Sequence, residues 1–146
     1  MIPLDVLTVG KLQGSDEYFV ILREHDGDRL LPIHIGPFEA LAISRGMTGG
    51  PQPRPFTHDL LGAVIGRLGA KLERVLVHDL RDDTFFSQLE LGTDRGLLEV
   101  DCRTSDAVAL AVRMRSPIFA TEEVVARAAV LPQPGGLDDE DDDPIS

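Results

Sequence analysis

The pattern of apolar and polar positions predicts three short strands and a helix in the first third of the chain. Residues 2–9 alternate in polarity, residues 18–22 are rich in β-favouring side chains, and residues 30–35 are mostly apolar, so each is predicted to be a strand. Gly36-Pro37 ends the third strand, and Pro37 favours a helix start. The following helix is predicted to bury one face, formed by Phe38, Leu41 and Ala42.

A second helix is predicted after a loop rich in glycine and proline, at residues 47–56. Thr57 is expected to cap this helix, Asp59 lies in its first turn, and Gly69 is expected to end it. Its expected buried stripe consists of Leu60, Leu61, Val64, Ile65 and Leu68.

The same plan follows in the second half of the chain. Strands are predicted near residues 70–80, 84–91 and 97–102, followed by a helix over 105–114 that is apolar on nearly every side. Such a helix must be covered by other elements, so it is predicted to lie at the centre of the domain. Thr121 is expected to cap a last helix that runs to about Ala129.

The two halves align without a gap when the sequence is shifted by 67 positions. Residues 8–47 share eight identities in forty with residues 75–114, and the strand and helix patterns coincide throughout. We therefore predict an α+β fold built from two strand–strand–strand–helix units in a pseudo-two-fold relation, each followed by a second helix.

Composition indicates one soluble domain over residues 1–130 and a disordered acidic tail over 131–146. The tail holds six acidic and no basic residues, so the net charge of −11 leaves −5 for the domain. An acidic domain without a lysine and arginine cluster needs a local basic group or a metal ion to bind nucleic acid. Cys102 is the single cysteine, no apolar run is long enough for a membrane span, and no signal peptide precedes the first strand, which together favour the cytoplasm.

The joint between the last long strand and the central helix is the strongest candidate site. Asp101, Arg103, Ser105 and Asp106 lie within six positions there. A capping serine and an acidic first turn explain Ser105 and Asp106 without any function, whereas Asp101 and Arg103 need a further explanation. A carboxylate beside an arginine at a helix start can hold a metal ion or a phosphate.

Two His-Asp pairs and one glutamate are secondary candidates. His58-Asp59 lies at a helix start and His78-Asp79 at a strand end, where ordinary capping and solvation are also sufficient explanations. Glu39 occupies the position in the first unit that Asp106 occupies in the second. The sequence leaves open whether these two equivalent positions converge.

Four stretches together resemble the bifunctional nuclease domain family: PIHIGPFEALAI (32–43), RPFTHDLL (54–61), LERVLVHDL (72–80) and DCRTSDAVALAVR (101–113). The resemblance covers residues 3 to 129 and implies an α+β domain with nuclease activity on RNA and DNA. The positions that match the family's motif include Gly36, Glu39, Arg54, Thr57, His58, Asp59, His78, Asp79, Asp101, Arg103, Ser105 and Asp106.

These observations lead to one hypothesis and one alternative. The hypothesis is a nuclease that hydrolyses phosphodiester bonds of RNA or DNA with the help of Mg²⁺ or Mn²⁺. His58 would be the general base and Arg103 the phosphate clamp. The alternative is a non-enzymatic module that binds a small anion or a protein partner at the same joint. The catalytic set is His58, Asp59, Asp101, Arg103 and Asp106, the metal ligands are Glu39, Asp59, Asp101 and Asp106, and the binding residues are Glu39, Arg54, Asp79 and Ser105.

We also expect a homo-oligomer, most simply a two-fold dimer. The early strand at residues 5–9 carries little charge to protect a free edge, and the helix over 105–114 is apolar on more sides than a small sheet could cover.

Overall fold

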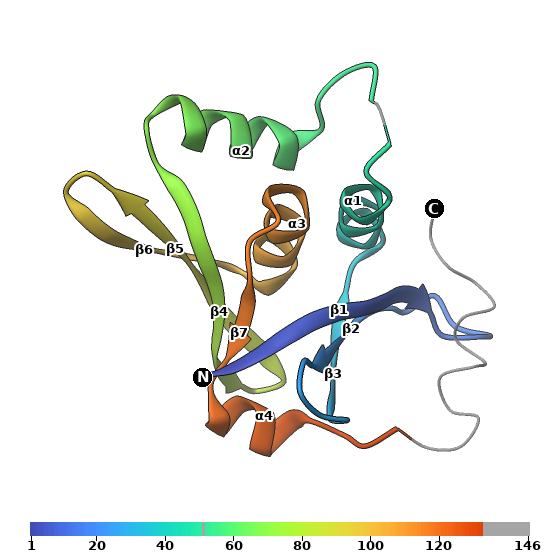
Figure 1. Cartoon of the computed structure of the whole chain (residues 1–146). Coiled ribbons are helices and arrows are strands. Elements are labelled where there is room, and N and C mark those ends of the chain that lie inside the picture. The colour runs from blue at the N-terminus through green and yellow to red at the C-terminus, as the bar shows by residue number, and fades with distance from the viewer. Residues whose placement is uncertain (51, 133–146) are drawn as a thin grey trace.

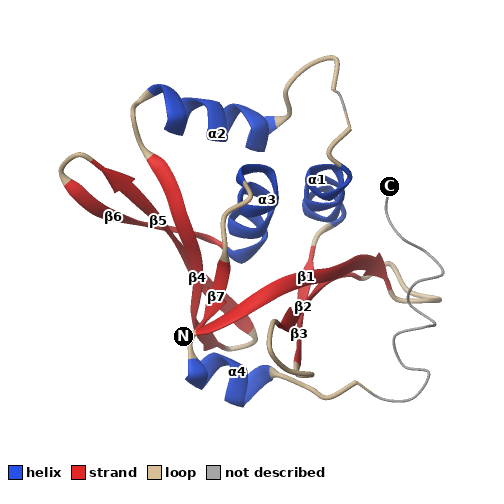
Figure 2. Ribbon diagram, in the orientation of Figure 1, coloured by secondary structure: helices blue, strands red, loops and turns tan. Residues whose placement is uncertain are grey.

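The computed structural model describes residues 1–50 and 52–132. Within them the chain forms seven strands and four helices, in the α+β class that the sequence predicts (Figures 1 and 2). The elements are β1 (Ile2–Lys11), β2 (Tyr18–Glu24), β3 (Leu30–Ile35), α1 (Pro37–Thr48), α2 (Thr57–Arg67), β4 (Lys71–Arg81), β5 (Thr84–Thr93), β6 (Gly96–Arg103), α3 (Thr104–Met114), β7 (Ile118–Ala120) and α4 (Glu122–Ala128).

All seven strands form one sheet in the order β3-β2-β1-β7-β4-β5-β6. The three strands of each half pair antiparallel with their sequence neighbours, and β7 joins the halves by pairing antiparallel to β1 and parallel to β4. The predicted order of three strands, a helix and a second helix occurs twice, with β7 inserted before α4. The pseudo-two-fold relation between the units stays a prediction.

Helix α3 lies at the centre of the domain, as its apolar sequence predicts. Residues 107–111 are buried, and α3 packs against α1, α2 and the strands β4 to β6. Figure 1 shows α1 beside α3 and α2 across α3 from the sheet, whereas α4 lies on the other side of the strands. Because other elements of the same chain cover α3, and β1 is an inner strand between β2 and β7, neither feature is left free to drive oligomerisation.

The predicted buried stripe of α2 is wrong at four of its five positions. Ile65 is the buried residue of this helix, whereas Leu60 and Leu68 are 57% and 80% exposed and Leu61 and Val64 are also exposed. The reason is that α2 has one main packing partner, α3, and approaches it along the side marked by Gly62. Apolar periodicity identified the helix correctly and assigned too much of it to the core.

The helix ends follow the predictions in part. Thr121 caps α4 as expected, because its hydroxyl accepts a hydrogen bond from the Val124 amide at 3.2 Å. Thr57 is instead the first residue of α2, after Phe56 as N-cap, and the Asp59 carboxylate accepts the Phe56 amide at 2.8 Å. An acidic side chain inside the first turn therefore replaces the expected threonine cap.

The end of the domain pairs with the far edge of the sheet. Val130 forms a bridge with Leu30 on β3, through two backbone hydrogen bonds of 2.7 and 2.8 Å. The predicted disordered tail over 131–146 lies outside the described residues apart from its first two positions. Among the helices of residues 1–50 and 52–132, none combines the length and apolarity needed to cross a bilayer.

Candidate functional site

Four side chains from the first turns of three helices and from one strand end form a continuous chain of contacts. His58 comes from α2, Asp106 from α3 and Glu39 from α1, and Arg103 is the last residue of β6. His58 Nε2 lies 2.9 Å from Asp106 Oδ1, and Arg103 contacts both Asp106 and Glu39. Glu39 and Asp106 therefore converge on Arg103, a question that the sequence left open.

Arg103 is the central member of this site. Its Nε and Nη2 groups donate to the two carboxylate oxygens of Asp106, at 2.9 and 3.2 Å, and its Nη1 donates to Glu39 Oε2 at 3.2 Å. The arginine side chain is 65% exposed, so its remaining N–H groups can reach a ligand. A guanidinium held between two carboxylates is well placed to bind a phosphate or another planar anion.

The charge state of Asp106 decides which ring nitrogen of His58 carries the proton. Partial burial alone would raise the pKa of the Asp106 carboxyl, but hydrogen bonds from Arg103 and His58 outweigh it and hold that pKa below its ordinary value. Asp106 is therefore a carboxylate at neutral pH. Because a carboxylate only accepts hydrogen bonds, His58 Nε2 must carry the proton and donate it to Asp106. In the neutral imidazole this leaves Nδ1 as the unprotonated nitrogen.

Gly36 makes room for Glu39. A Cβ atom at Gly36 would lie well inside 3.0 Å of Glu39 Oε1, so the absence of a side chain lets the carboxylate fold back over the start of α1. The backbone of Gly36 is extended, at φ −82° and ψ 167°, so the glycine is needed for space and not for an unusual conformation. This close approach fixes the position from which Glu39 contacts Arg103.

Two hollows flank the Glu39–Arg103 pair and share both residues. The smaller, about 350 Å³, extends toward the β4–β5 turn and is bordered by Ser105. The larger, about 600 Å³, runs between α1 and α2, past His58 and Asp106, and Phe38 forms part of its wall. A ligand with a charged group and a flat apolar group could contact Arg103 and this wall together.

Phe38 and the start of α3 differ from expectation. Phe38 was predicted to be in the core, yet it is 81% exposed, because it lies in the first turn of α1 at the rim of the larger hollow. Neither Thr104 nor Ser105 caps α3, whose N-cap is Arg103, and the Thr104 hydroxyl instead lies 2.6 Å from that of Ser87. The position of Phe38 directly before the motif residue Glu39 is the signal that could have placed it at the site.

The other predicted residues lie elsewhere. Asp59 pairs with Arg113 at 2.8 Å, and Asp101 is exposed on β6 opposite Gln88. Asp79 accepts a hydrogen bond from the Leu80 amide and forms an ion pair with the Arg81 guanidinium. Arg54 is exposed in the loop before α2.

Asp59 has a structural role. Its carboxylate joins the start of α2 to Arg113 on α3, and Arg113 also donates to the carbonyl oxygens of Ala42 and Ala109. Burial would raise the pKa of Asp59, but the Phe56 amide and the Arg113 guanidinium outweigh it and lower that pKa. The pair therefore connects all three helices on one side of the sheet.

The four predicted metal ligands do not form a ready-made cluster. Among residues 1–50 and 52–132, no group of three or more histidine, cysteine or acidic side chains is placed to hold a metal ion. Glu39 and Asp106 are linked through Arg103, whereas Asp59 and Asp101 lie apart from them. We therefore assign no catalytic step to a bound metal.

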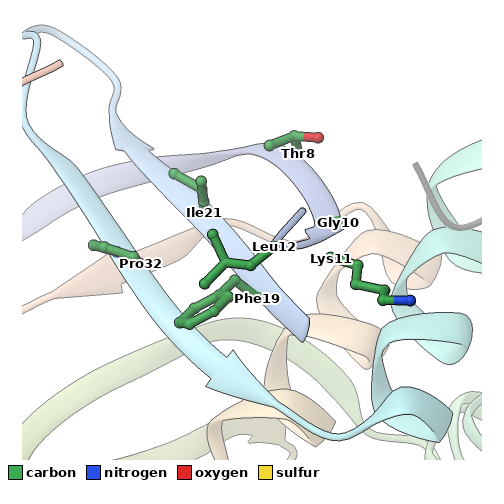
Figure 3. Close-up of a pocket in the computed structure, with 7 residues that line it drawn as sticks. All are labelled: Thr8, Gly10, Lys11, Leu12, Phe19, Ile21 and Pro32. Carbon is green, nitrogen blue, oxygen red and sulfur yellow. The ribbon is translucent and has the colours of Figure 1, made fainter. Parts of the chain in front are cut away.

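A separate apolar pocket of about 100 Å³ lies on the half of the sheet formed by β1 to β3 (Figure 3). Phe19 and Ile21 point into it and therefore away from Val20 and Leu22, which belong to the main core. Lys11 is the one charged residue among those that line it, and no carboxylate or histidine is present to perform acid–base chemistry. The lining residues are Thr8, Gly10, Lys11, Leu12, Phe19, Ile21 and Pro32.

Comparisons with known proteins indicate the family of the chain. The family model described as the bifunctional nuclease domain matches residues 20–133. An uncharacterized protein of Mycobacterium tuberculosis is 43% identical over 119 residues, which is 82% of this chain and 71% of the relative. Bifunctional nuclease 1 of Arabidopsis thaliana is 27% identical over 103 residues, which is 68% of this chain and 32% of that protein. Bifunctional nuclease 1 of Oryza sativa subsp. indica is 25% identical over 109 residues, 72% of this chain and 33% of that protein.

The structure is therefore that of a mixed α+β domain with a polar site where the first turns of three helices meet. The chain belongs to the bifunctional nuclease domain family. It spans about a third of the length of the plant relatives that carry the nuclease name.

Proposed function

We propose that this chain is a nuclease that hydrolyses phosphodiester bonds of RNA and DNA at the site formed by Glu39, His58, Arg103 and Asp106. One observation carries the proposal. His58, which is hydrogen-bonded to the Asp106 carboxylate, lies beside Arg103, whose guanidinium has N–H groups that neither Asp106 nor Glu39 uses. A base held by a third group, next to a cation for the developing charge, is the arrangement that hydrolysis requires.

In this proposal His58 is the general base. Asp106 holds the imidazole with Nε2–H toward itself, so Nδ1 takes a proton from a water molecule as that water attacks phosphorus. The bond from phosphorus to the leaving sugar oxygen then breaks, and that oxygen takes a proton from solvent. Water is the nucleophile because DNA has no 2′-hydroxyl that could attack instead. The imidazolium formed in this step is stabilised by the Asp106 carboxylate.

Arg103 would bind the scissile phosphate. Its free N–H groups would donate to the non-bridging oxygens, and this interaction strengthens as negative charge accumulates in the transition state. Glu39 is then a positioning residue, because it holds one end of the guanidinium and does not contact the substrate.

The charge balance of the site decides how a phosphate can enter. Glu39 and Asp106 carry two negative charges against one positive charge on Arg103, so the side chains sum to −1 with a neutral His58. The positive ends of the α1, α2 and α3 dipoles lie at the same place and offset part of this charge. We propose that Mg²⁺ or Mn²⁺ supplies the rest, as an ion that arrives with the substrate phosphates, since Mg²⁺ is commonly held by one or two carboxylates and phosphate oxygens.

The test is cleavage of labelled single-stranded RNA and DNA by the purified chain with Mg²⁺ or Mn²⁺. We expect Asp106→Asn and Arg103→Ala to lose at least about a hundredfold in kcat/KM. Asp94→Asn, an equal change of charge at the exposed β5–β6 turn, should retain activity. Cleavage that Asp106→Asn leaves unchanged would come from a contaminating enzyme, and the proposal would fail.

The alternative function, binding without catalysis, gives a different result in the same experiment. The Arg103 guanidinium and three helix N-termini could retain an anion without any use of His58. A binding module would hold oligonucleotide or inorganic phosphate in an Arg103-dependent way, show no cleavage, and be insensitive to His58→Ala.

A further inference from the structure

The exposed side of α2 lacks charge in a strongly acidic protein. Between Asp59 and Arg67 the helix has seven consecutive uncharged residues. Leu60 and Val64 are 57% and 44% exposed, and Leu68 just after the helix is 80% exposed. A contiguous apolar patch on a soluble chain commonly marks an interaction surface.

Strand β6 carries a second group of exposed apolar side chains, on the same side of the sheet as α2. Leu98 and Val100 pair with Leu91 and Leu89 on β5, so they lie on the face of the sheet that packs against α3. They are nevertheless 53% and 41% exposed, so α3 covers this part of β6 incompletely. We call the apolar side chains of Leu60, Leu61, Val64, Leu68, Leu98 and Val100 the α2–β6 surface.

The two edges of the sheet are protected to different degrees. At β3 the edge carries Pro32, which lacks an amide donor, and Val130 pairs with Leu30 there. At β6 all eight residues are on an edge strand with a regular register, without bulge or proline. The β6 edge therefore depends on its charged side chains, Glu99 and Asp101, to resist pairing.

We propose that the α2–β6 surface is covered by a second copy of this chain. Two chains that each carry −11 repel each other least where acidic side chains are missing, and this surface meets that condition. The surface consists of six apolar side chains that are exposed in a single copy, and packing two copies against each other would remove them from water. An uncharged surface is also self-complementary, as an isologous two-fold contact requires.

The contact should be face to face and not an extension of the sheet. Strand alternation directs Glu99 and Asp101 to the face opposite Leu98 and Val100. Pairing β6 with its copy edge to edge would bring these carboxylates close to those of the partner, whereas packing through α2 keeps them apart. Because His58 is in the first turn of α2, the interface would form beside the proposed site, although the dimer does not depend on the proposed function.

The test is the solution mass of the full chain by size exclusion with light scattering. We expect twice the 15.9 kDa monomer mass at micromolar protein for the native chain and for Leu131→Asp, a matched change at an exposed leucine outside the surface. Val64→Asp and Leu68→Glu should give the monomer mass with an unchanged circular dichroism spectrum, since both side chains are exposed in a single copy. A native chain that stays monomeric up to about 100 µM would overturn the proposal.

A milder pair of variants covers the case in which a charged variant fails to fold. Val64→Ala with Leu68→Ala should raise the dimer Kd at least about tenfold by sedimentation equilibrium, while Leu131→Ala leaves it unchanged. A dimer whose Kd is the same in all three proteins would place the interface elsewhere and refute the assignment of this surface.

Discussion

Replacing Gly36 by alanine tests whether the position of Glu39 matters to the site. The new Cβ would lie well inside 3.0 Å of Glu39 Oε1, so the carboxylate must move by several tenths of an ångström or more. The 3.2 Å contact between Glu39 Oε2 and Arg103 Nη1 is then lost or lengthened. The end of a flexible side chain can move cheaply, so the change should act on the geometry of the guanidinium more than on folding.

The expected magnitudes follow from exposure and distance. Arg103 is 65% exposed, so its pair with Glu39 contributes about 0 to 1 kcal/mol to stability, and the loss is offset by about 0.4 to 1 kcal/mol from the reduced freedom of the unfolded chain. The melting temperature should therefore change by less than about 5 °C. Displacement of a phosphate-binding group by a fraction of an ångström should lower kcat/KM about tenfold, given that a full 1 Å can cost about a hundredfold.

Gly27→Ala is the matched control. A Cβ atom there would collide in the same way with a glutamate carboxylate, Glu24, which pairs with Arg29 away from the site. Both variants should melt alike, and only Gly36→Ala should lose activity on labelled RNA. Native kcat/KM in a folded Gly36→Ala protein would refute the view that Glu39 positions Arg103.

Further results are expected from substitutions at three positions. His58→Asn should lower kcat about a hundredfold or more, since it removes the group proposed as general base; an unaltered kcat would exclude His58 from that role. Asp59→Ala should lower the free energy of unfolding by about 2 kcal/mol in urea titrations, because it removes the carboxylate partner of Arg113, whose side chain is only 9% exposed. The control Asp16→Ala, at a fully exposed side chain, should change the free energy of unfolding by less than about 0.5 kcal/mol. The pKa of Asp59 is lowered in the folded state, so its contribution is present above about pH 4 and is lost as the pH falls below that value; Asp59→Ala should therefore show a weaker acid destabilisation than the native chain. Phe38→Ala should raise KM for single-stranded RNA about tenfold while Phe38→Tyr retains it, if a base stacks on the exposed ring.

The sequence predicted those features that depend on local pattern. The apolar run of α3 required a buried central helix, and the order of strands and helices followed from turn residues and polarity. The candidate joint at Arg103 and Asp106 was also found, because a strand end that runs into an acidic helix start is visible in the chain itself. These features each depend on residues close together in the sequence.

The remaining features depend on packing between distant segments. Exposure of Leu60 and Leu68 follows from the single side on which α2 meets α3, and no periodicity within the helix reports how many partners it has. Packing also separates the two members of the first His-Asp pair. Adjacent residues on a helix point in different directions, so Asp59 pairs with Arg113 whereas His58 contacts Asp106. Spacing alone could not separate these two members of one His-Asp pair.

The three-residue strand β7 determines when during synthesis the sheet can be completed. β1 and β4 do not pair with each other, and β7 supplies the hydrogen bonds between them through residues 118–120. Until that segment leaves the ribosome, the first hundred residues can form only two separate three-stranded sheets, each with an open inner edge. Those edges are the places where a nascent chain can pair with the wrong partner. A chain stalled before Ile118 should therefore aggregate or bind a chaperone, and release of the next few residues should remove both edges in one step.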